Sequence, residues 1–301
     1  MSVTTQKLGT LEYLTAEGIS APHCFTTRLG GVSVGHLESL NLSMSQGDDP
    51  ANVVENYRRI GAVLGFTPQD VVMARQTHSD IVLRVGREHR GAGLLREKLP
   101  ECDALITNEP GVALFVSTAD CTPILLHDPV TGAVGAAHAG WRGTAAAIGA
   151  KTVAAMVRCF GCDPRNIRAA IGPNIGLCHF ETDADVPQAM VSAYGGEAEA
   201  FITQKGSKFY LDLKAINALS LRRAGVEHID ISTECTVCQC DRFWSHRVTR
   251  GNPVPRVPLF YARRDPVETN HCFSAVPGAD GISAWLRQRT GICAHRRCFD
   301  Y

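Results

Sequence analysis

The chain has 301 residues, of which 45% are hydrophobic and 20% are charged, and this composition is that of a folded globular protein rather than a disordered one. Its 30 basic and 30 acidic side chains cancel, so net charge gives no reason to expect nucleic acid or an anionic membrane as a partner. No apolar run approaches the ~20 residues that span a bilayer, and the first residues lack the pattern of a signal peptide. We therefore expect a cytoplasmic protein without nucleic-acid or membrane partners.

Strand and helix patterns intermix along the chain. An apolar run before a glycine turn predicts a strand in residues 24–33, and Asp49 before Pro50 predicts a helix that ends near Leu64. We expect further strands at 71–75, 81–85, 104–107, 113–117, 124–127, 133–137 and 167–172, and further helices at 143–160, 186–194 and 213–224. This order predicts an α/β fold on mixed sheets, without the regular alternation of a dinucleotide-binding fold.

The 12 cysteines do not indicate a disulfide framework, because they are spread through a long chain with enough apolar residues for a core. We expect most of them to be reduced, with a few as metal ligands or nucleophiles. Two CxxC pairs occur, Cys159 with Cys162 and Cys235 with Cys238. One structural zinc held by both pairs is the less favoured interpretation, because zinc knuckles normally stand in shorter, more turn-rich segments.

Three polar segments follow predicted strands, at the positions where α/β proteins place their sites. These segments are residues 75–80, 117–123 and 136–143. They contain His78, Cys121 and His138, and two imidazoles with one thiolate would leave one tetrahedral position of Zn²⁺ open, as in catalytic zinc sites. The same donors would also accept copper. Spacing alone does not show that they converge, and each residue taken singly is also typical of a protein core.

A second interpretation makes Cys121 a nucleophile and His138 its base, with Asp120 or Gln76 in support, as in cysteine hydrolases. The two interpretations exclude each other, because a thiolate held by zinc is a poor nucleophile. In either case Arg142, at a predicted helix start, would suit phosphate or another anion.

Eight ordered blocks carry a family resemblance over about residues 20–250. The blocks are residues 25–33, 39–42, 47–50, 76–78, 102–107, 118–123, 137–143 and 171–181. With them the chain resembles the bacterial laccase-domain proteins, once called multicopper polyphenol oxidases and now described as purine nucleoside phosphorylases. The resemblance implies a single domain with α/β/β/α layers, similar to a class of cysteine hydrolases.

The resemblance also implies a metal site and an activity. His78, Cys121 and His138 match the family's ligands, which are generally taken to bind zinc. The implied reaction is phosphorolysis of adenosine, inosine or methylthioadenosine, which gives ribose 1-phosphate from the first two, with adenosine deamination as a side activity. The older name implies copper-dependent polyphenol oxidation, and that chemistry would require copper because zinc is redox-inactive.

Supporting roles are our inference from residue chemistry. Arg28 and Arg142 would hold phosphate by forked hydrogen bonds, and Gln76 would contact the substrate. Asp120 or Glu181 would move a proton, beside Cys121 and His138 as catalytic residues. The alternatives are a surface salt bridge for Arg142 and a helix-capping carboxylate for Glu181.

The C-terminal part departs from the family pattern. Ser245-His246-Arg247 stands where Ser-Tyr-Arg is common, and three prolines follow where members usually have one short final strand. We expect a domain at residues 1–252 and a divergent tail at 253–301 without a comparable strand, either a genuine extension or a shifted reading frame.

These observations predict a zinc-dependent purine nucleoside phosphorylase that acts on small molecules as a monomer, with side deaminase activity. The alternatives are a copper polyphenol oxidase and a cysteine hydrolase using Cys121 and His138. The oxidase would need copper clusters beyond one site, and no two histidines lie two positions apart. A non-enzymatic metal-binding module has little support beyond the cysteine count.

Overall fold

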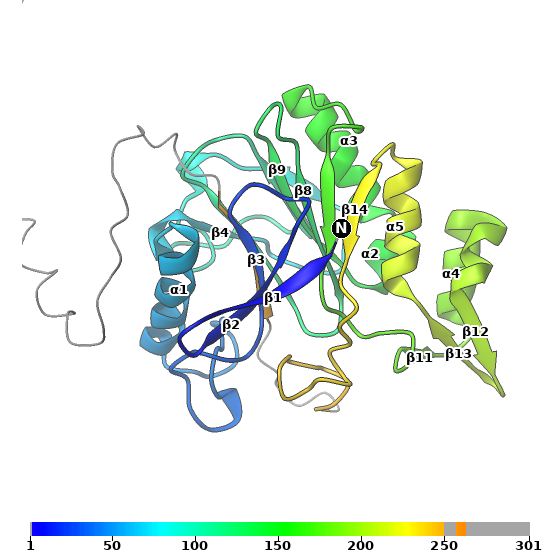
Figure 1. The fold of residues 1–301 in the computed structure, drawn as a ribbon, viewed down its shortest axis with the longest axis horizontal. Coiled ribbons are helices and arrows are strands. Elements are labelled where there is room, and N and C mark those ends of the chain that lie inside the picture. Colours follow the sequence, from blue (N-terminus) through cyan, green and yellow to red (C-terminus); the bar gives the residue numbers. More distant parts are fainter. Residues whose placement is uncertain (1, 250–256, 263–301) are drawn as a thin grey trace, which may run out of the picture. The chain divides into compact units, whose positions relative to one another are not determined.

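The computed structural model describes residues 2–249 and the backbone of residues 257–262. Two six-stranded mixed sheets dominate this part of the chain (Figure 1). The first sheet has the order β1 (Val3–Leu8), β2 (Leu11–Ala16), β3 (His23–Thr26), β15 (Val257–Ala262), β7 (Ala113–Thr118) and β4 (Val71–Met73). The second has the order β14 (His228–Ile231), β10 (Arg168–Ile171), β8 (Thr122–His127), β9 (Val134–Ala139), β6 (Ala104–Thr107) and β5 (Val82–Arg84).

The two sheets pack face to face over one apolar core. Leu14, Phe25 and Leu114 of the first sheet share a buried cluster with Leu105 and Leu125 of the second. Strands β7, β8 and β9 are buried on both faces, so they read as nearly continuous apolar runs rather than as alternating ones.

Helices cover the outer faces of both sheets. Helix α1 (Pro50–Leu64) packs on the first sheet through Tyr57, whose ring centroid lies 5.3 Å from that of Phe115. Helices α3 (Ile148–Phe160) and α5 (Leu213–Arg223) pack on the second sheet (Figure 1). The α/β/β/α arrangement expected from the resemblance is therefore the architecture of the described residues.

A smaller substructure adjoins α5. It comprises the antiparallel strands β11 (Glu181–Thr182), β13 (Lys208–Leu211) and β12 (Ile202–Lys205), with helix α4 (Asp185–Tyr194). Short 3₁₀ turns occupy Gly35–Leu37, Pro68–Asp70, Arg87–His89 and Gly195–Phe201. No helix among the described residues is long and apolar enough to cross a membrane.

Two sequence predictions are wrong at element level. The single helix expected at 143–160 is two helices, α2 (Trp141–Ala145) and α3, because Ala147 between them takes a positive φ of 58°. The final strand expected to be missing is present as β15, which lies between β3 and β7 inside the first sheet and not at its edge. The rest of the tail assigned to residues 253–301 lies outside the described residues.

Candidate metal centre

The structure brings together the three residues that the sequence singled out. His78 lies in the loop from β4 to β5, Cys121 in the turn from β7 to β8, and His138 within β9. One ligand atom from each lies within 4.8 Å of those of the other two. His78 Nε2 is 3.9 Å from Cys121 Sγ, and the two imidazole centroids are 5.0 Å apart. The first two ligands thus stand where the chain passes from one sheet to the other.

The backbone is strained beside these ligands. His78 has a φ of 61° and Asp120, which precedes Cys121, has a φ of 80°. Such left-handed conformations cost on the order of 1–3 kcal/mol at residues other than glycine, and they persist where the surrounding structure holds them. The strain is therefore located in the two connections that aim ligands at the centre.

Asp103, a residue that sequence reasoning missed, organises the site. It is fully buried directly before β6, and its Oδ1 accepts a hydrogen bond from His138 Nδ1 at 2.7 Å. The same carboxylate accepts backbone N–H bonds from Thr77, His78 and Ser79. It therefore fixes the His138 ring with Nε2 available to a metal, the arrangement of a carboxylate–histidine–metal triad. The sequence did contain one signal for Asp103: it stands directly before a predicted strand, within one of the blocks that carry the family resemblance.

The charges favour a thiolate at Cys121. Burial alone would raise the pKa of its thiol, but the charge and hydrogen bond of His138 and the hydrogen bond of His78 outweigh burial and lower the pKa to about 6. Burial would likewise lower the pKa of His138, but the Cys121 thiolate and Asp103 raise it to about 9. Each group therefore favours the charged form of the other, thiolate at Cys121 and imidazolium at His138. A metal would bind the thiolate directly and would displace the His138 proton.

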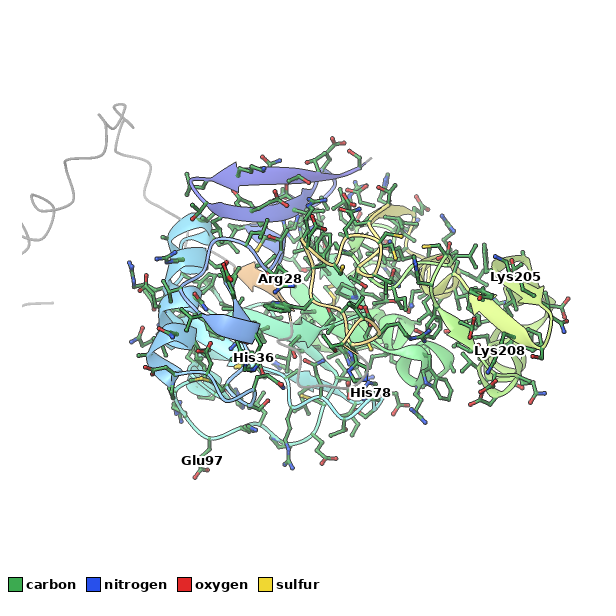
Figure 2. The ribbon with its side chains drawn as sticks, turned by 90° about the horizontal axis from the view of Figure 1, so that it is seen from below. Arg28, His36, His78, Glu97, Lys205 and Lys208 are labelled. Atoms are coloured by element: carbon green, nitrogen blue, oxygen red, sulfur yellow. The ribbon has the colours of Figure 1, made fainter. Side chains whose placement is uncertain are left out.

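Gln76 and Arg28 both form hydrogen bonds to the backbone of neighbouring segments. Gln76 exchanges two hydrogen bonds of 2.7 Å with the backbone of Ser117, which ties the His78 loop to the end of β7. The Arg28 guanidinium lies 3.7 Å above the Trp244 ring and donates to backbone carbonyls, including that of Glu38. Arg28 and His78 are well separated in Figure 2.

Asp120 and Glu181 differ in accessibility. Asp120 is buried, and its two carboxylate oxygens accept hydrogen bonds from Thr236 Oγ1 and from the Arg247 backbone N–H, both at 2.6 Å. Glu181 lies exposed on β11 and accepts a hydrogen bond from the Tyr210 hydroxyl. Asp120 therefore anchors the segment around residues 236–247 to the Cys121 turn, whereas Glu181 has the carboxylate that solvent reaches.

Arg142 is exposed in the second position of α2, four residues after His138. Its guanidinium lies 4.3 Å from the Trp141 ring centroid, and within the described residues it forms no salt bridge. The surface salt bridge considered for it is therefore not formed there, and its hydrogen-bond donors remain open to an anion.

Gly140 lies between His138 and α2, and a side chain there would collide with the ligands. An added Cβ would be 2.7 Å from His78 Cδ2 and 3.2 Å from Cys121 Sγ. Because the φ of Gly140 is −64°, alanine fits the backbone and the clash falls on the ligands alone. We expect Gly140→Ala to weaken metal binding by roughly 10–100-fold, the range seen when a residue that supports a metal ligand is changed.

The measurement for Gly140→Ala is a chelator competition titration combined with thermal unfolding of the metal-free protein. Gly143→Ala is the matched control, since its Cβ would meet nothing closer than 3.4 Å. We expect both metal-free variants to unfold near the wild-type temperature. Wild-type metal affinity in Gly140→Ala would contradict the close approach of His78 and Cys121 to Gly140.

Comparisons with known proteins agree with one another. A family model described as multi-copper polyphenol oxidoreductase laccase matches residues 22–255. The purine nucleoside phosphorylase of Deinococcus radiodurans is 39% identical over 244 residues, which cover 80% of this chain and 89% of the relative. The purine nucleoside phosphorylase YlmD of Geobacillus stearothermophilus is 38% identical over 245 residues, with the same shares covered.

Solved structures show the same fold. YlmD from Geobacillus stearothermophilus superposes with a TM-score of 0.83 at 35% identity, covering 88% of this chain and 100% of the other. The protein YfiH of Bacillus licheniformis gives a TM-score of 0.81 at 34% identity, covering 86% and 99%.

Proposed function

The chain belongs to the multi-copper polyphenol oxidoreductase laccase family, and from that premise we propose that it is a metal-dependent purine nucleoside phosphorylase. The observation that carries the proposal is the convergence of His78, Cys121 and His138, whose donor set leaves one tetrahedral position for a substrate or water. We propose zinc as the metal, and copper as the alternative, because a thiolate with imidazoles suits both.

The donor atoms at the centre suit a metal ion. Other residues of the chain orient its ligands, bind phosphate and transfer a proton. When bound, the metal provides Lewis-acid polarisation in its open position. Asp103 holds the His138 ring through Nδ1, and the lowered pKa of Cys121 favours its thiolate form. Arg142 binds phosphate by charge-assisted hydrogen bonds, so that phosphate meets the anomeric carbon as the glycosidic bond breaks. Glu181, the more accessible of the two carboxylates considered, moves a proton to or from the purine.

Adenosine deamination and methylthioadenosine phosphorolysis are further activities that we propose for the same pocket. Both reactions act on a purine nucleoside, so the pocket that binds the purine for phosphorolysis would also serve them. We also propose that the protein acts in the cytoplasm as a single chain on small molecules.

A cysteine hydrolase is the second candidate, and one observation favours it. Without a metal, Cys121, His138 and Asp103 have the order of nucleophile, base and orienting carboxylate. A copper polyphenol oxidase is the third candidate, since the family description names that chemistry.

Replacing Arg142 with alanine tests the phosphate assignment. We expect the KM for phosphate to rise about 10–100-fold, because a hydrogen bond to a charged group contributes about 1.5–3 kcal/mol. Zinc content should stay unchanged, since Arg142 supports no ligand. The measurements are steady-state phosphorolysis of inosine and metal analysis, with the exposed Arg158→Ala as control. Equal loss of zinc and activity would mean that Arg142 supports the fold instead.

A further inference from the structure

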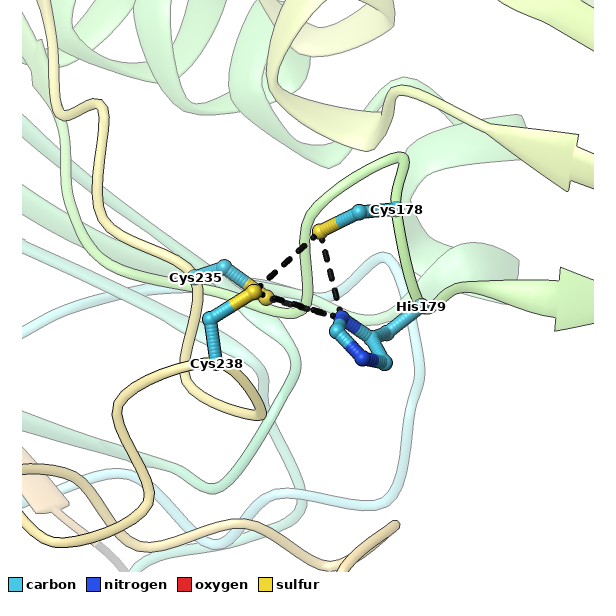
Figure 3. Close-up of side chains that lie close together, drawn as sticks. All are labelled: Cys178, His179, Cys235 and Cys238. Carbon is cyan, nitrogen blue, oxygen red and sulfur yellow. Dashed lines mark hydrogen bonds between the residues drawn. The ribbon is translucent and has the colours of Figure 1, made fainter.

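A second group of metal-binding side chains lies outside the centre described above. Cys178, His179, Cys235 and Cys238 each offer one donor atom, and the four atoms all lie within 4.8 Å of one another. Figure 3 shows the four side chains pointing into one common space. We call this group the cysteine cluster. It joins the loop that follows β10 to the loop that follows β14.

The cluster replaces the pairing of the two CxxC motifs considered from the sequence. Cys162 is buried, with its sulfur 3.3 Å from the Thr131 hydroxyl, and it takes no part in the cluster. Cys235 and Cys238 instead lie beside Cys178 and His179, which come some 60 positions earlier in the chain.

The spacing of the donor atoms suits one tetrahedral ion. Cys178 Sγ lies 3.5 Å from Cys238 Sγ. His179 Nδ1 lies 3.2 Å from Cys178 Sγ, 3.4 Å from Cys238 Sγ and 3.8 Å from Cys235 Sγ. Bond lengths of about 2.3 Å for Zn–S and 2.0–2.1 Å for Zn–N place tetrahedral donors roughly 3.5–3.8 Å apart. These separations therefore need only small adjustments around a zinc ion.

A backbone N–H group and a buried ammonium lie beside the cluster. The Gly176 N–H donates to Cys235 Sγ at 3.2 Å. A Cβ on Gly176 would lie 3.3 Å from Cys178 Sγ, so glycine allows the loop to approach both cysteines closely. The side chain of Lys214 is buried next to the cluster. Its ammonium donates to the carbonyl of Glu234, the residue before Cys235. Lys214 also lines the same cavity as Cys178 and Cys235. Three thiolates and Zn²⁺ carry one net negative charge, which this ammonium balances.

We propose that Cys178, His179, Cys235 and Cys238 bind a structural zinc ion, distinct from the metal at His78, Cys121 and His138. All four positions of the ion are filled by protein, so this site has no place for a substrate. Binding requires Cys178, Cys235 and Cys238 as thiolates and a neutral His179, and any thiol protons pass to solvent. The proposal concerns metal binding and does not rest on the proposed reaction.

The second zinc would also position the first centre. Thr236, between two of its ligands, donates to Asp120, and the Arg247 guanidinium donates to the carbonyl of His179. Asp120 directly precedes Cys121. Fastening the 235–247 segment at the cysteine cluster therefore stabilises the turn that carries the Cys121 ligand.

Metal counting on the full-length protein tests the proposal. We expect about two zinc ions per wild-type chain and about one in both Cys238→Ser and His78→Ala, because each variant loses one ligand of a different site. Cys240→Ser is the matched control, since Cys240 is exposed beside the cluster but is not a member of it, and it should keep the wild-type zinc content.

If a variant fails to fold, thiol labelling of the wild-type protein tests the same proposal. Cys178, Cys238 and Cys240 are all exposed, so iodoacetamide reaches all three, and a bound metal would protect only the first two. We expect Cys178 and Cys238 to react at least about tenfold more slowly than Cys240 until a chelator is added, because a zinc-bound thiolate is a poor nucleophile.

Equal alkylation of all three cysteines before chelation would overturn the proposal, as would a Cys178–Cys238 disulfide in freshly isolated, unoxidised protein. A wild-type chain whose single zinc is lost in His78→Ala would also overturn it. Two zinc ions without nucleoside phosphorolysis would instead contradict only the proposed function.

Discussion

Replacing Cys121 with serine should strip the metal from the first centre and abolish nucleoside turnover. The change exchanges a thiolate, already favoured by a pKa near 6, for a neutral hydroxyl that binds zinc weakly. Mutation of a residue that only orients a metal ligand typically costs about 10–100-fold in metal affinity or activity. Loss of a direct ligand should therefore lower kcat/KM by more than about 100-fold. Phosphorolysis and deamination should fall together, because both need the same pocket. Metal analysis and both assays on one preparation make the measurement.

The control for this variant is Cys159→Ser, a half-buried thiol near the end of α3 that belongs to neither metal-binding group. It should keep wild-type metal content and activity. Full zinc content in Cys121→Ser together with lost activity and a trappable substrate adduct on the wild-type thiol would favour the cysteine hydrolase instead.

Replacing Asp103 with asparagine should weaken both the fold and the metal site. The carboxylate is buried and accepts several hydrogen bonds at once, and breaking a buried ion pair from one side costs about 3–5 kcal/mol. Zinc affinity should fall roughly 10–100-fold, because His138 loses its orienting partner. Denaturant unfolding of the metal-free protein and a zinc titration measure the two effects. Asp80→Asn, at an exposed ion pair with Lys151, should change either quantity little.

The stability difference between wild type and Asp103→Asn should depend on pH. Burial would raise the pKa of Asp103, but hydrogen bonds from His138 and Ser79 outweigh burial and lower the pKa in the folded state. A lowered carboxyl pKa stabilises the fold above the ordinary aspartate value of about 4 and loses that contribution as the pH falls further. The difference should therefore be full at pH 6 and shrink below pH 4. A constant difference across this range would contradict the role assigned to the charge.

Local signals in the sequence were sufficient for much of the fold. Asp49 caps α1, and Pro50 stands at its first turn, so the predicted helix is confirmed with both its bounds. Strand β6 matches its predicted range because a short apolar run between polar residues admits few alternatives. The layer order needed the family resemblance, because periodicity does not show which face of a sheet a helix covers.

The errors have physical causes. Prolines before and within β15 argue against a strand, yet pairing with β3 and β7 on both sides outweighs the backbone N–H that Pro258 lacks. The break between α2 and α3 falls in an alanine-rich stretch with no helix-terminating residue, so no local signal marks it.

The sequence predicted the three metal-binding side chains of the candidate site but not the residues that hold them in place. His78 and Cys121 follow strands, and His138 lies near the end of β9. All three carry metal-binding chemistry, so residue type and position identify them. Asp103 acts on His138 across 35 positions, and the cysteine cluster spans 60, so only the folded chain shows these partners. The substrate contacts predicted for Gln76 and Arg28 stay predictions, and the structure adds the hydrogen bonds by which both side chains hold the backbone of neighbouring segments.

We propose that a metal at His78, Cys121 and His138 serves phosphorolysis of purine nucleosides. Product analysis with inosine and phosphate tests this directly, using protein purified without added copper and analysed for metal. We expect zinc in the protein, base release that requires phosphate, and ribose 1-phosphate in amounts equal to the base. Base release that is indifferent to phosphate, or phenol oxidation by copper-loaded protein that exceeds any nucleoside turnover, would contradict it.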